Sequence, residues 1–497
     1  MFKSFPFRIY LVALFLRLIP VLLTRGLGIG LDDMFQYDML ARSLAAGHGY
    51  RWYAEADIER FNAQLEAATS LRLDFDLTSV KDYDPVLGTP TSFRAPLYPA
   101  FLAVIYFFSG TEFSRFFVAR LIQATLLGAP LAPLTYFVAK RLFPPSTFHT
   151  KEDRTEKASR LSAWIIAVYP LLLVYPLGLG TENPFFVLLL ASFLCILSSI
   201  EKTSSSATRF LFSGLLLGLT ALTRSVILPF AVAVLCLLFY YHRRRAIPAM
   251  VSFLLVVAPW IVRNSLLHHQ PTGIETSMGY NLYLGYHPQG NGSFFFGPSL
   301  DLMLVLDDAE RDRFGTEKAI QFIKAQPERV LPLAANRLGY FFGLEKRVLM
   351  YFYSNNLFGF IPLPLLLTLS AVLLLPFGFV AIFAALGLSL LRWKPEHLLL
   401  LLLFVGYITP HVLILAEDRF HLALIPYFAI LAARVWIGGW RDISARWKES
   451  RSGRVMVLAC GLAALFLVAN WGFELLRDAD TIVLLLGPFG NQTYLPY

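Results

Sequence analysis

Charged residues are scarce in this chain: Asp, Glu, Lys and Arg make up 15% of its 497 residues, whereas 56% are hydrophobic. This balance excludes an ordinary soluble protein. Repeated apolar runs of membrane-spanning length indicate an α-helical protein that crosses a membrane several times. Only three cysteines are present, each inside an apolar run. We therefore expect neither a disulfide framework nor a cysteine metal site.

A cleavage site of small residues is missing after the first apolar segment, although Lys3 and Arg8 give that segment a basic start. We therefore expect a retained first span and not a signal peptide. The net charge of +9 does not require an acidic polymer as partner, because Lys and Arg concentrate in the cytoplasmic loops of membrane proteins. No nucleic acid is expected as a partner.

The topology depends on the apolar stretch 97–109. Its 13 residues reach only about 20 Å as a helix, whereas the hydrocarbon core is about 30 Å thick. If this stretch crossed, five later loops with 18 Lys and Arg would face outward, against the positive-inside rule. We therefore interpret 97–109 as a re-entrant or surface helix on the outer side.

This interpretation predicts an all-α polytopic membrane protein with about 11 transmembrane helices. The stretch 209–241 is divided into two spans because Arg224 interrupts it. Two large outer-face loops, 25–116 and 262–361, are expected to contain juxtamembrane helices, the second over 316–342. The expected spans are 7–24, 117–139, 161–179, 184–200, 209–223, 226–241, 246–261, 365–390, 398–415, 422–437 and 455–470.

The segment 31–50 follows the first span and begins with two adjacent carboxylates, Asp32 and Asp33. Apolar residues recur from Phe35 to Leu44 at helical spacing, which predicts an amphipathic helix against the membrane. Two interpretations of the acid pair stay open. It is either part of a site, or Asp32 caps the helix while Asp33 interacts with its dipole.

Ionisable residues outside the basic loops gather at the outer ends of the spans. An arginine at such a position often extends to the interface without a further role. Several arginines near one surface, however, suit phosphate, which guanidinium groups bind in planar, bidentate geometry. Together with carboxylates they favour a substrate that carries phosphate on a long apolar tail. These residues are Asp32, Asp33, Arg94, Arg120, Glu182, Arg224, Arg263, Glu417, Asp418 and Arg419.

The order of short motifs along the chain resembles the GT-C glycosyltransferases that use polyprenyl-phosphate sugars, such as the protein O-mannosyltransferases and the aminoarabinose transferases of lipid A. Each motif alone is weak evidence for the resemblance. Their order, and their position on the same side of the membrane over most of the chain, are stronger evidence. The motifs are Asp32-Asp33, Arg94-Ala95-Pro96-Leu97-Tyr98-Pro99, Thr181-Glu182-Asn183-Pro184, Leu222-Thr223-Arg224, Pro259-Trp260-Ile261-Val262-Arg263-Asn264, Gly279-Tyr280-Asn281-Leu282-Tyr283-Leu284-Gly285 and Asp418-Arg419-Phe420.

The resemblance implies roles for these residues. Asp32 matches the acid that acts as catalytic base, Asp33 stands where Glu is more usual, and Glu182 matches the second acidic position. The donor phosphate would be bound by Arg94, Arg224, Arg263 and Arg419, and the substrate by Tyr98, Tyr280 and Asn281. Residues 1–361 would form the catalytic membrane module, and 362–497 the C-terminal transmembrane helices with an outward tail.

The activity implied is inverting transfer of a sugar from a polyprenyl-phosphate donor to a glycan, lipid or protein hydroxyl. The protein would lie in the plasma (inner) membrane, among membrane lipids, with a cytoplasmic N-terminus and an extracytoplasmic active site. No His/Cys metal motif appears in the sequence, so a metal is optional and no cofactor is required. Oxygen ligands from Asp32, Asp33 and Glu182 could still share Mg²⁺ or Mn²⁺.

Two other functions stay open. A transporter or flippase of polyprenyl-linked sugars would use the same outer arginines without a base, but it should show charged or broken helices near mid-membrane. A noncatalytic assembly factor would tolerate loss of the acid pair.

Overall fold

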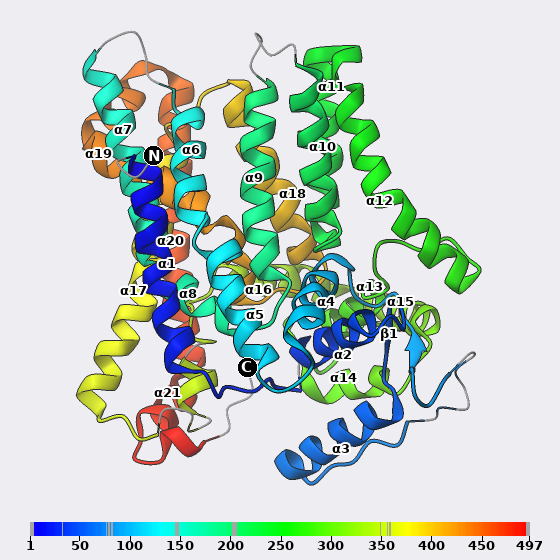
Figure 1. Ribbon diagram of the computed structural model, residues 1–497. Coiled ribbons are helices and arrows are strands. Elements are labelled where there is room, and N and C mark those ends of the chain that lie inside the picture. Colours follow the sequence, from blue (N-terminus) through cyan, green and yellow to red (C-terminus); the bar gives the residue numbers. More distant parts are fainter. Residues whose placement is uncertain are drawn as a thin grey trace.

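The computed structural model describes residues 4–493 except 32, 76, 78–79, 81–82, 145–148, 201–205, 348, 355 and 357–358. Asp32 therefore lies outside the described residues. Most of the described chain is helical, which confirms the predicted all-α class (Figure 1). Its one sheet is a two-stranded antiparallel ribbon in which Arg51 pairs with Pro90 and Trp52 with Thr89.

The first half of the chain contains the first outer loop and several long apolar helices. Its elements are α1 (Phe5–Leu23), α2 (Asp33–Ala45), β1 (Arg51–Trp52), α3 (Glu55–Thr69), β2 (Thr89–Pro90), α4 (Leu97–Ser109), α5 (Arg115–Gln123), a π-helical turn η2 (Ala124–Gly128), α6 (Leu131–Leu142), α7 (His149–Val168), α8 (Pro170–Val174), η3 (Tyr175–Leu177), α9 (Glu182–Ile200), α10 (Ala207–Ala221), η4 (Ser225–Ile227), α11 (Leu228–His242), η5 (Arg243–Ala246) and α12 (Ile247–His268).

The second half contains the other outer loop and the remaining long helices. Its elements are α13 (Met278–Tyr286), α14 (Phe296–Met303), α15 (Asp308–Ala325), η6 (Pro327–Arg329), α16 (Val330–Phe341), η7 (Leu349–Tyr353), α17 (Leu363–Leu388), α18 (Pro395–Leu413), η8 (Asp418–Leu424), α19 (Ile425–Glu449), α20 (Arg451–Arg477), α21 (Ala479–Leu486) and η9 (Gly490–Gln492).

Among the described residues, eight helical segments are long and apolar enough to cross a membrane, or nine if the bent pair α7–α8 is one span. The eleven expected spans differ at three places. They include the bent pair and the 15-residue α10, and they divide the segment Ser225–His268, in which η5 separates α11 from α12. The multi-span class is thus confirmed, while the number eleven stays a prediction.

Several expected boundaries are confirmed. Helix α4 covers the predicted stretch 97–109 and falls short of a span. Arg224 has an extended backbone between α10 and η4, as its interruption of the apolar run predicted. The helical stretch expected over 316–342 is present but divided between α15 and α16. Pro327 begins the short η6 there, because proline cannot donate to the preceding helix.

The basic loops meet at one end of the bundle, as the topology argument requires. His397 contacts the Leu142 carbonyl at 3.2 Å, Arg392 pairs with Glu449 at 2.6 Å, and the ring of Phe210 lies 5.1 Å from that of His242. Figure 1 shows this end beside the N-terminus, whereas α2, α3 and α13 to α15 lie at the opposite end. Because the N-terminus and the first basic loop lie at the same end, an even number of spans separates them, which fits a helix α4 that does not cross.

One large core joins the two parts of the chain divided at residue 361. The ring of Phe185 in α9 stacks at 5.7 Å on Tyr407 in α18, and Phe193 meets Tyr427 of α19 at 4.9 Å. The C-terminal helices therefore pack directly against the helices that precede the second outer loop.

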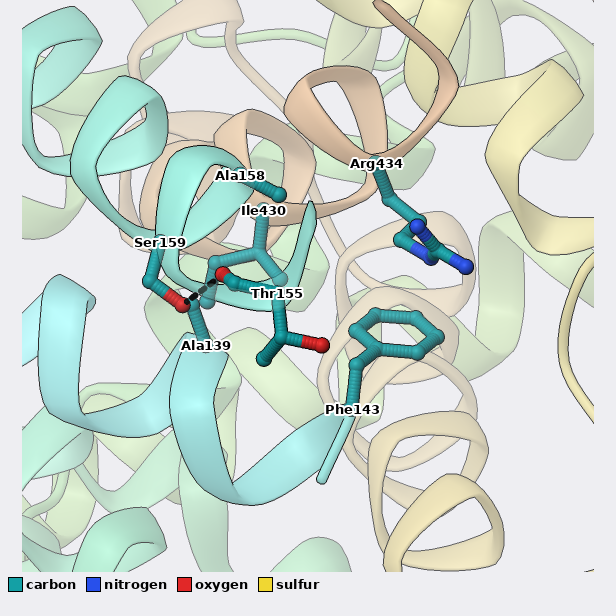
Figure 2. Close-up of a pocket in the computed structure, with 7 residues that line it drawn as sticks. All are labelled: Ala139, Phe143, Thr155, Ala158, Ser159, Ile430 and Arg434. Atoms are coloured by element: carbon teal, nitrogen blue, oxygen red, sulfur yellow. Dashed lines mark hydrogen bonds between the residues drawn. The ribbon is translucent and has the colours of Figure 1, made fainter. Parts of the chain in front are cut away.

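A small cavity lies at the basic end, between α6, α7 and α19. Figure 2 shows residues that line it, among them Phe143, Thr155, Ser159 and Arg434. Its volume of about 10 Å³ is room for a single water molecule. This cavity contains none of the predicted site residues.

Candidate active site

Helix α2 is held between two aromatic clusters, so its first turn has a fixed place. Phe35, Met39 and Leu40 pack toward α3, while Tyr37 and Ala41 pack against α4 and α5. The predicted amphipathic helix is therefore confirmed as a helix, but protein covers both of its sides. Asp33 is its first residue, as the capping interpretation expected.

A buried ion network ties α2 to its neighbours. Asp38 is 2% exposed and accepts from Nε and Nη2 of Arg115 at 2.8 and 2.9 Å. It also accepts from Nε of Arg42 at 2.9 Å, and Nη2 of Arg42 reaches Asp57 of α3 at 2.7 Å. Two carboxylates and two guanidinium groups thus join α2, α3 and α5 without net charge.

The residues before α4 are equally constrained. The carboxylate of Asp308 accepts from the Thr91 hydroxyl at 2.5 Å and the Ser92 amide at 2.7 Å, and it pairs with Arg311 at 2.9 Å. These contacts bring Arg94 to the start of α2. There Arg94 forms an ion pair with Asp33 and donates to Gln36 at 2.8 Å.

Glu182 is the counterpart of Asp33 on helix α9. Its side chain, 8% exposed, lies in the first turn of α9 and pairs with Nη1 of Arg224 at 2.7 Å. The extended backbone of Arg224 between α10 and η4 leads its side chain to this carboxylate. The same guanidinium lies over the ring of Phe420 at 5.3 Å.

Arg419 connects the two acid–arginine pairs. Its Nη1 lies 3.7 Å from Glu182 and its Nη2 lies 3.8 Å from Asp33, while its Nε lies 2.7 Å from Glu417. The first two distances exceed a hydrogen bond, and no hydrogen bond from Nη1 or Nη2 reaches a described residue. These donors are placed between two carboxylates and can still bind another oxygen.

Arg347, which the sequence analysis did not single out, completes this charge cluster. It lies in the second outer loop, after α16, and pairs with Glu417 at 2.9 Å. None of the motifs named in the sequence analysis includes Arg347, so they gave no signal for it. We use the name charge cluster for Asp33, Arg94, Glu182, Arg224, Arg347, Glu417 and Arg419, in which the guanidinium groups outnumber the carboxylates by one.

The field of these arginines decides the ionisation of Asp33. Loss of water around its carboxylate would raise its pKa, but Arg94, Arg419 and Arg224 outweigh that effect, so its pKa lies below the ordinary value. Burial would lower the pKa of Arg94, but Asp33 reverses this and raises it. Asp33 is therefore a carboxylate, and Arg94 a cation, at neutral pH.

Tyrosines border the charge cluster. Burial raises the pKa of Tyr37 to about 12, and the guanidinium of Arg94 lies 5.4 Å from its ring centre. Burial also raises the pKa of Tyr280 to about 12. Tyr280 meets the site through Phe93, whose ring it contacts at 5.6 Å. Both phenols remain neutral hydrogen-bonding groups at neutral pH.

The other predicted residues have different surroundings. Tyr98 is fully buried and donates to Gln123 at 2.6 Å. Its ring packs against the ring of Tyr37. Arg263 donates to the Thr91 carbonyl at 2.5 Å, which favours a role in holding the loop before Arg94. Asn281 is half-buried on α13. Their assignments to phosphate and substrate stay predictions.

Two further arginines have structural partners. Arg120 is fully buried and donates to the carbonyls of Leu27, Gly28 and Leu177. Arg17, inside α1, donates to carbonyls of α7, as expected for an arginine that pairs with a neighbouring helix. For a metal, no group of three His, Cys, Asp or Glu side chains with suitable spacing occurs among the described residues. Since Asp32 lies outside them, a cation shared with Asp32 stays a hypothesis.

An apolar groove of about 520 Å³ runs between α7, α8, α17 and α19. Its walls include Val168, Leu375 and Phe379. Tyr169 also lines the groove and donates to Glu345 at 2.6 Å, two residues from Arg347. One buried hydrogen bond thus connects a residue that lines the groove to Glu345, which is close in sequence to the charge-cluster residue Arg347.

Two solved membrane proteins are similar to this chain. The archaeal oligosaccharyltransferase AglB from Archaeoglobus fulgidus, in complex with an inhibitory peptide and a dolichol-phosphate, matches at 13% identity and a TM-score of 0.43, over 100% of this chain and 60% of its own. ArnT from Cupriavidus metallidurans, bound to undecaprenyl phosphate, matches at 12% identity and a TM-score of 0.38, over 88% of this chain and 78% of its own. The chain thus spans three-fifths of the archaeal enzyme's length. No family model and no curated protein matches it.

Proposed function

We propose that this protein is an inverting membrane glycosyltransferase with a polyprenyl-phosphate sugar as donor. The observation that carries the proposal is the position of Arg419. Its terminal nitrogens lie between Asp33 and Glu182 at 3.8 and 3.7 Å, while Arg94 pairs with Asp33 and Arg224 pairs with Glu182. A phosphate oxygen bound there would lie beside carboxylates that can activate an acceptor.

The chemistry follows from this arrangement. A carboxylate, which the motif resemblance assigns to Asp32, takes the proton of the acceptor hydroxyl as general base. The hydroxyl oxygen attacks the anomeric carbon from the side opposite to the phosphate, which inverts that centre. The bond from the anomeric carbon to the phosphate oxygen breaks, and the electron pair leaves with the lipid phosphate. Arginine side chains stabilise the charge that develops there.

The apolar groove supports a lipid-linked donor, because a prenyl chain needs an apolar surface that leads to the site. The positive-inside rule supports an active site at the extracytoplasmic face of the plasma membrane. The acceptor would be a hydroxyl of a glycan, lipid or protein. A transporter of polyprenyl-linked sugars is the second candidate, since the same arginines could bind its phosphate.

The test is sugar transfer from a radiolabelled polyprenyl-phosphate sugar by the purified full chain. We expect Asp32→Asn to abolish transfer while binding of the lipid phosphate is retained, since the amide cannot accept the proton. If Asp32→Asn transfers like the wild type, the base must be sought in Asp33 or Glu182. Movement of the labelled lipid between leaflets without any transfer would instead establish the transporter.

A further inference from the structure

Two segments that carry arginines of the charge cluster are joined by a second contact, deeper in the protein. Glu345 and His421 are 1% and 0% exposed. The Nε2 atom of His421 lies 3.0 Å from Oε1 of Glu345, and the same oxygen accepts from the Tyr169 hydroxyl at 2.6 Å. The contact thus joins the segment between α16 and η7 to η8.

The orientation of His421 is fixed by its neighbours. Its Nδ1 lies 2.7 Å from the Phe341 carbonyl, which can only accept, so Nδ1 carries a hydrogen. One proton must also lie between Nε2 and the Glu345 carboxyl, on either the ring or the acid. In both cases the pair is neutral overall. The ring also stacks on Phe377 at 4.0 Å with an interplanar angle of 9°.

The spacing of the residues makes this contact informative. Arg347 follows Glu345 by two residues, and Arg419 precedes His421 by two. Arg347 and Arg419 both meet Glu417, at 2.9 and 2.7 Å. The pairs Glu345–His421 and Arg347–Glu417 run in opposite order along the two segments. Fixing the first pair therefore fixes the register of the second.

A buried pair of this kind contributes little net stability. Oε2 of Glu345 is buried and has no hydrogen-bond partner among the described residues, which is unfavourable. Well-packed apolar side chains of similar volume are often as stable as a buried ionic pair, or more so. The role of the Glu345–His421 contact is thus better explained by the position that it gives to the two chain segments than by a gain in stability.

We propose that Glu345 and His421 are positioning residues that align Arg347 with Arg419, and that Arg347 is a further ligand of the lipid phosphate. This inference rests on the proposed function. It predicts that loss of Glu345 weakens phosphate binding through Arg347, and not through a general loss of folding.

The experiment measures binding of a long-chain polyprenyl phosphate to the purified full chain. We expect Glu345→Gln and Arg347→Gln each to weaken binding about tenfold, and the double variant about 10- to 20-fold, since residues in one network are not additive. Independent effects would multiply to about 100-fold. Thermal unfolding of each preparation separates loss of binding from loss of folding.

Glu156→Gln is the matched control. Glu156 also accepts from a tyrosine hydroxyl, that of Tyr136 at 2.9 Å, but it lies at the basic end of the bundle. The Glu156→Gln substitution should leave the affinity for polyprenyl phosphate unchanged, both alone and when combined with Arg347→Gln. If Glu345→Gln does not fold, Tyr169→Phe replaces it and should give a smaller, equally non-additive loss.

The outcomes are separable. This inference would be overturned, and the proposed function left intact, by either of two results. One is that the losses of affinity in Glu345→Gln and Arg347→Gln multiply in the double variant. The other is that Arg347→Gln binds with wild-type affinity. A wild-type chain that binds no polyprenyl phosphate would overturn both.

Discussion

Replacing Arg115 with Gln tests how helix α2, and with it Asp33, is held in place. Arg115 donates twice to the buried Asp38, at 2.8 and 2.9 Å, and its Nη1 donates to the Thr111 carbonyl at 2.5 Å. Removing one partner of a buried ion pair costs about 3–5 kcal/mol. Because Arg42 still pairs with Asp38, we expect the lower end, a loss of about 3 kcal/mol in the free energy of unfolding.

The assay is reversible unfolding of the purified protein in micelles titrated with a denaturing detergent. The matched control is Arg313→Gln. Arg313 lies 3.6 Å from Glu317, with side chains 65% and 56% exposed, and a surface pair contributes at most about 1 kcal/mol. Adding Asp38→Asn to the Arg115→Gln variant should restore part of the loss, since the buried carboxylate that has lost one of its two guanidinium partners is then neutral. Equal stability of Arg115→Gln and Arg313→Gln would refute the reasoning, and α2 would then be held by its apolar contacts alone.

Three further predictions concern the site itself. The folded pKa of Asp33 is lowered, so its stabilising contribution is complete above about pH 4 and is lost as the pH falls through the folded pKa. Acid titrations of wild type and Asp33→Asn should therefore converge only below about pH 4. Gly279→Ala should cost about 1–3 kcal/mol in chemical unfolding, because the added Cβ would lie 1.9 Å from the Asp312 carbonyl oxygen, whereas Gly297→Ala meets nothing within 4 Å and should be neutral. Arg94→Gln should weaken polyprenyl-phosphate binding about tenfold or more, and wild-type affinity in a titration would exclude Arg94 from the phosphate site.

The glycines of the motif Gly279–Gly285 show how the sequence and the structure complement each other. The motif contributed to a family resemblance without a physical reason. The structure supplies one, because Gly279 packs against the backbone of α15 and Gly285 against the Ile414 carbonyl. A side chain at either position would push α13, and Tyr280 with it, away from the site.

The sequence by itself determined the class, the position of the basic loops at one end of the bundle and several helix boundaries. These properties depend on local composition: apolar length decides what can span a membrane, basic residues mark one side, and Pro327 and Arg224 interrupt helices where they occur. The gathering of acids and arginines at one end also followed from the spans, and it predicted Asp33, Glu182, Arg94, Arg224 and Arg419 as one group.

Only the tertiary structure decided which charged residue meets which partner. Arg263 and Arg120 have the same sequence signature as Arg419, yet they bind backbone carbonyls, whereas Arg419 lies between two carboxylates. Arg347 lies in the charge cluster, although no sequence motif indicated it. The physical reason is that an arginine at the end of a span must find a partner, but sequence spacing along one helix does not specify the distant segment that provides it.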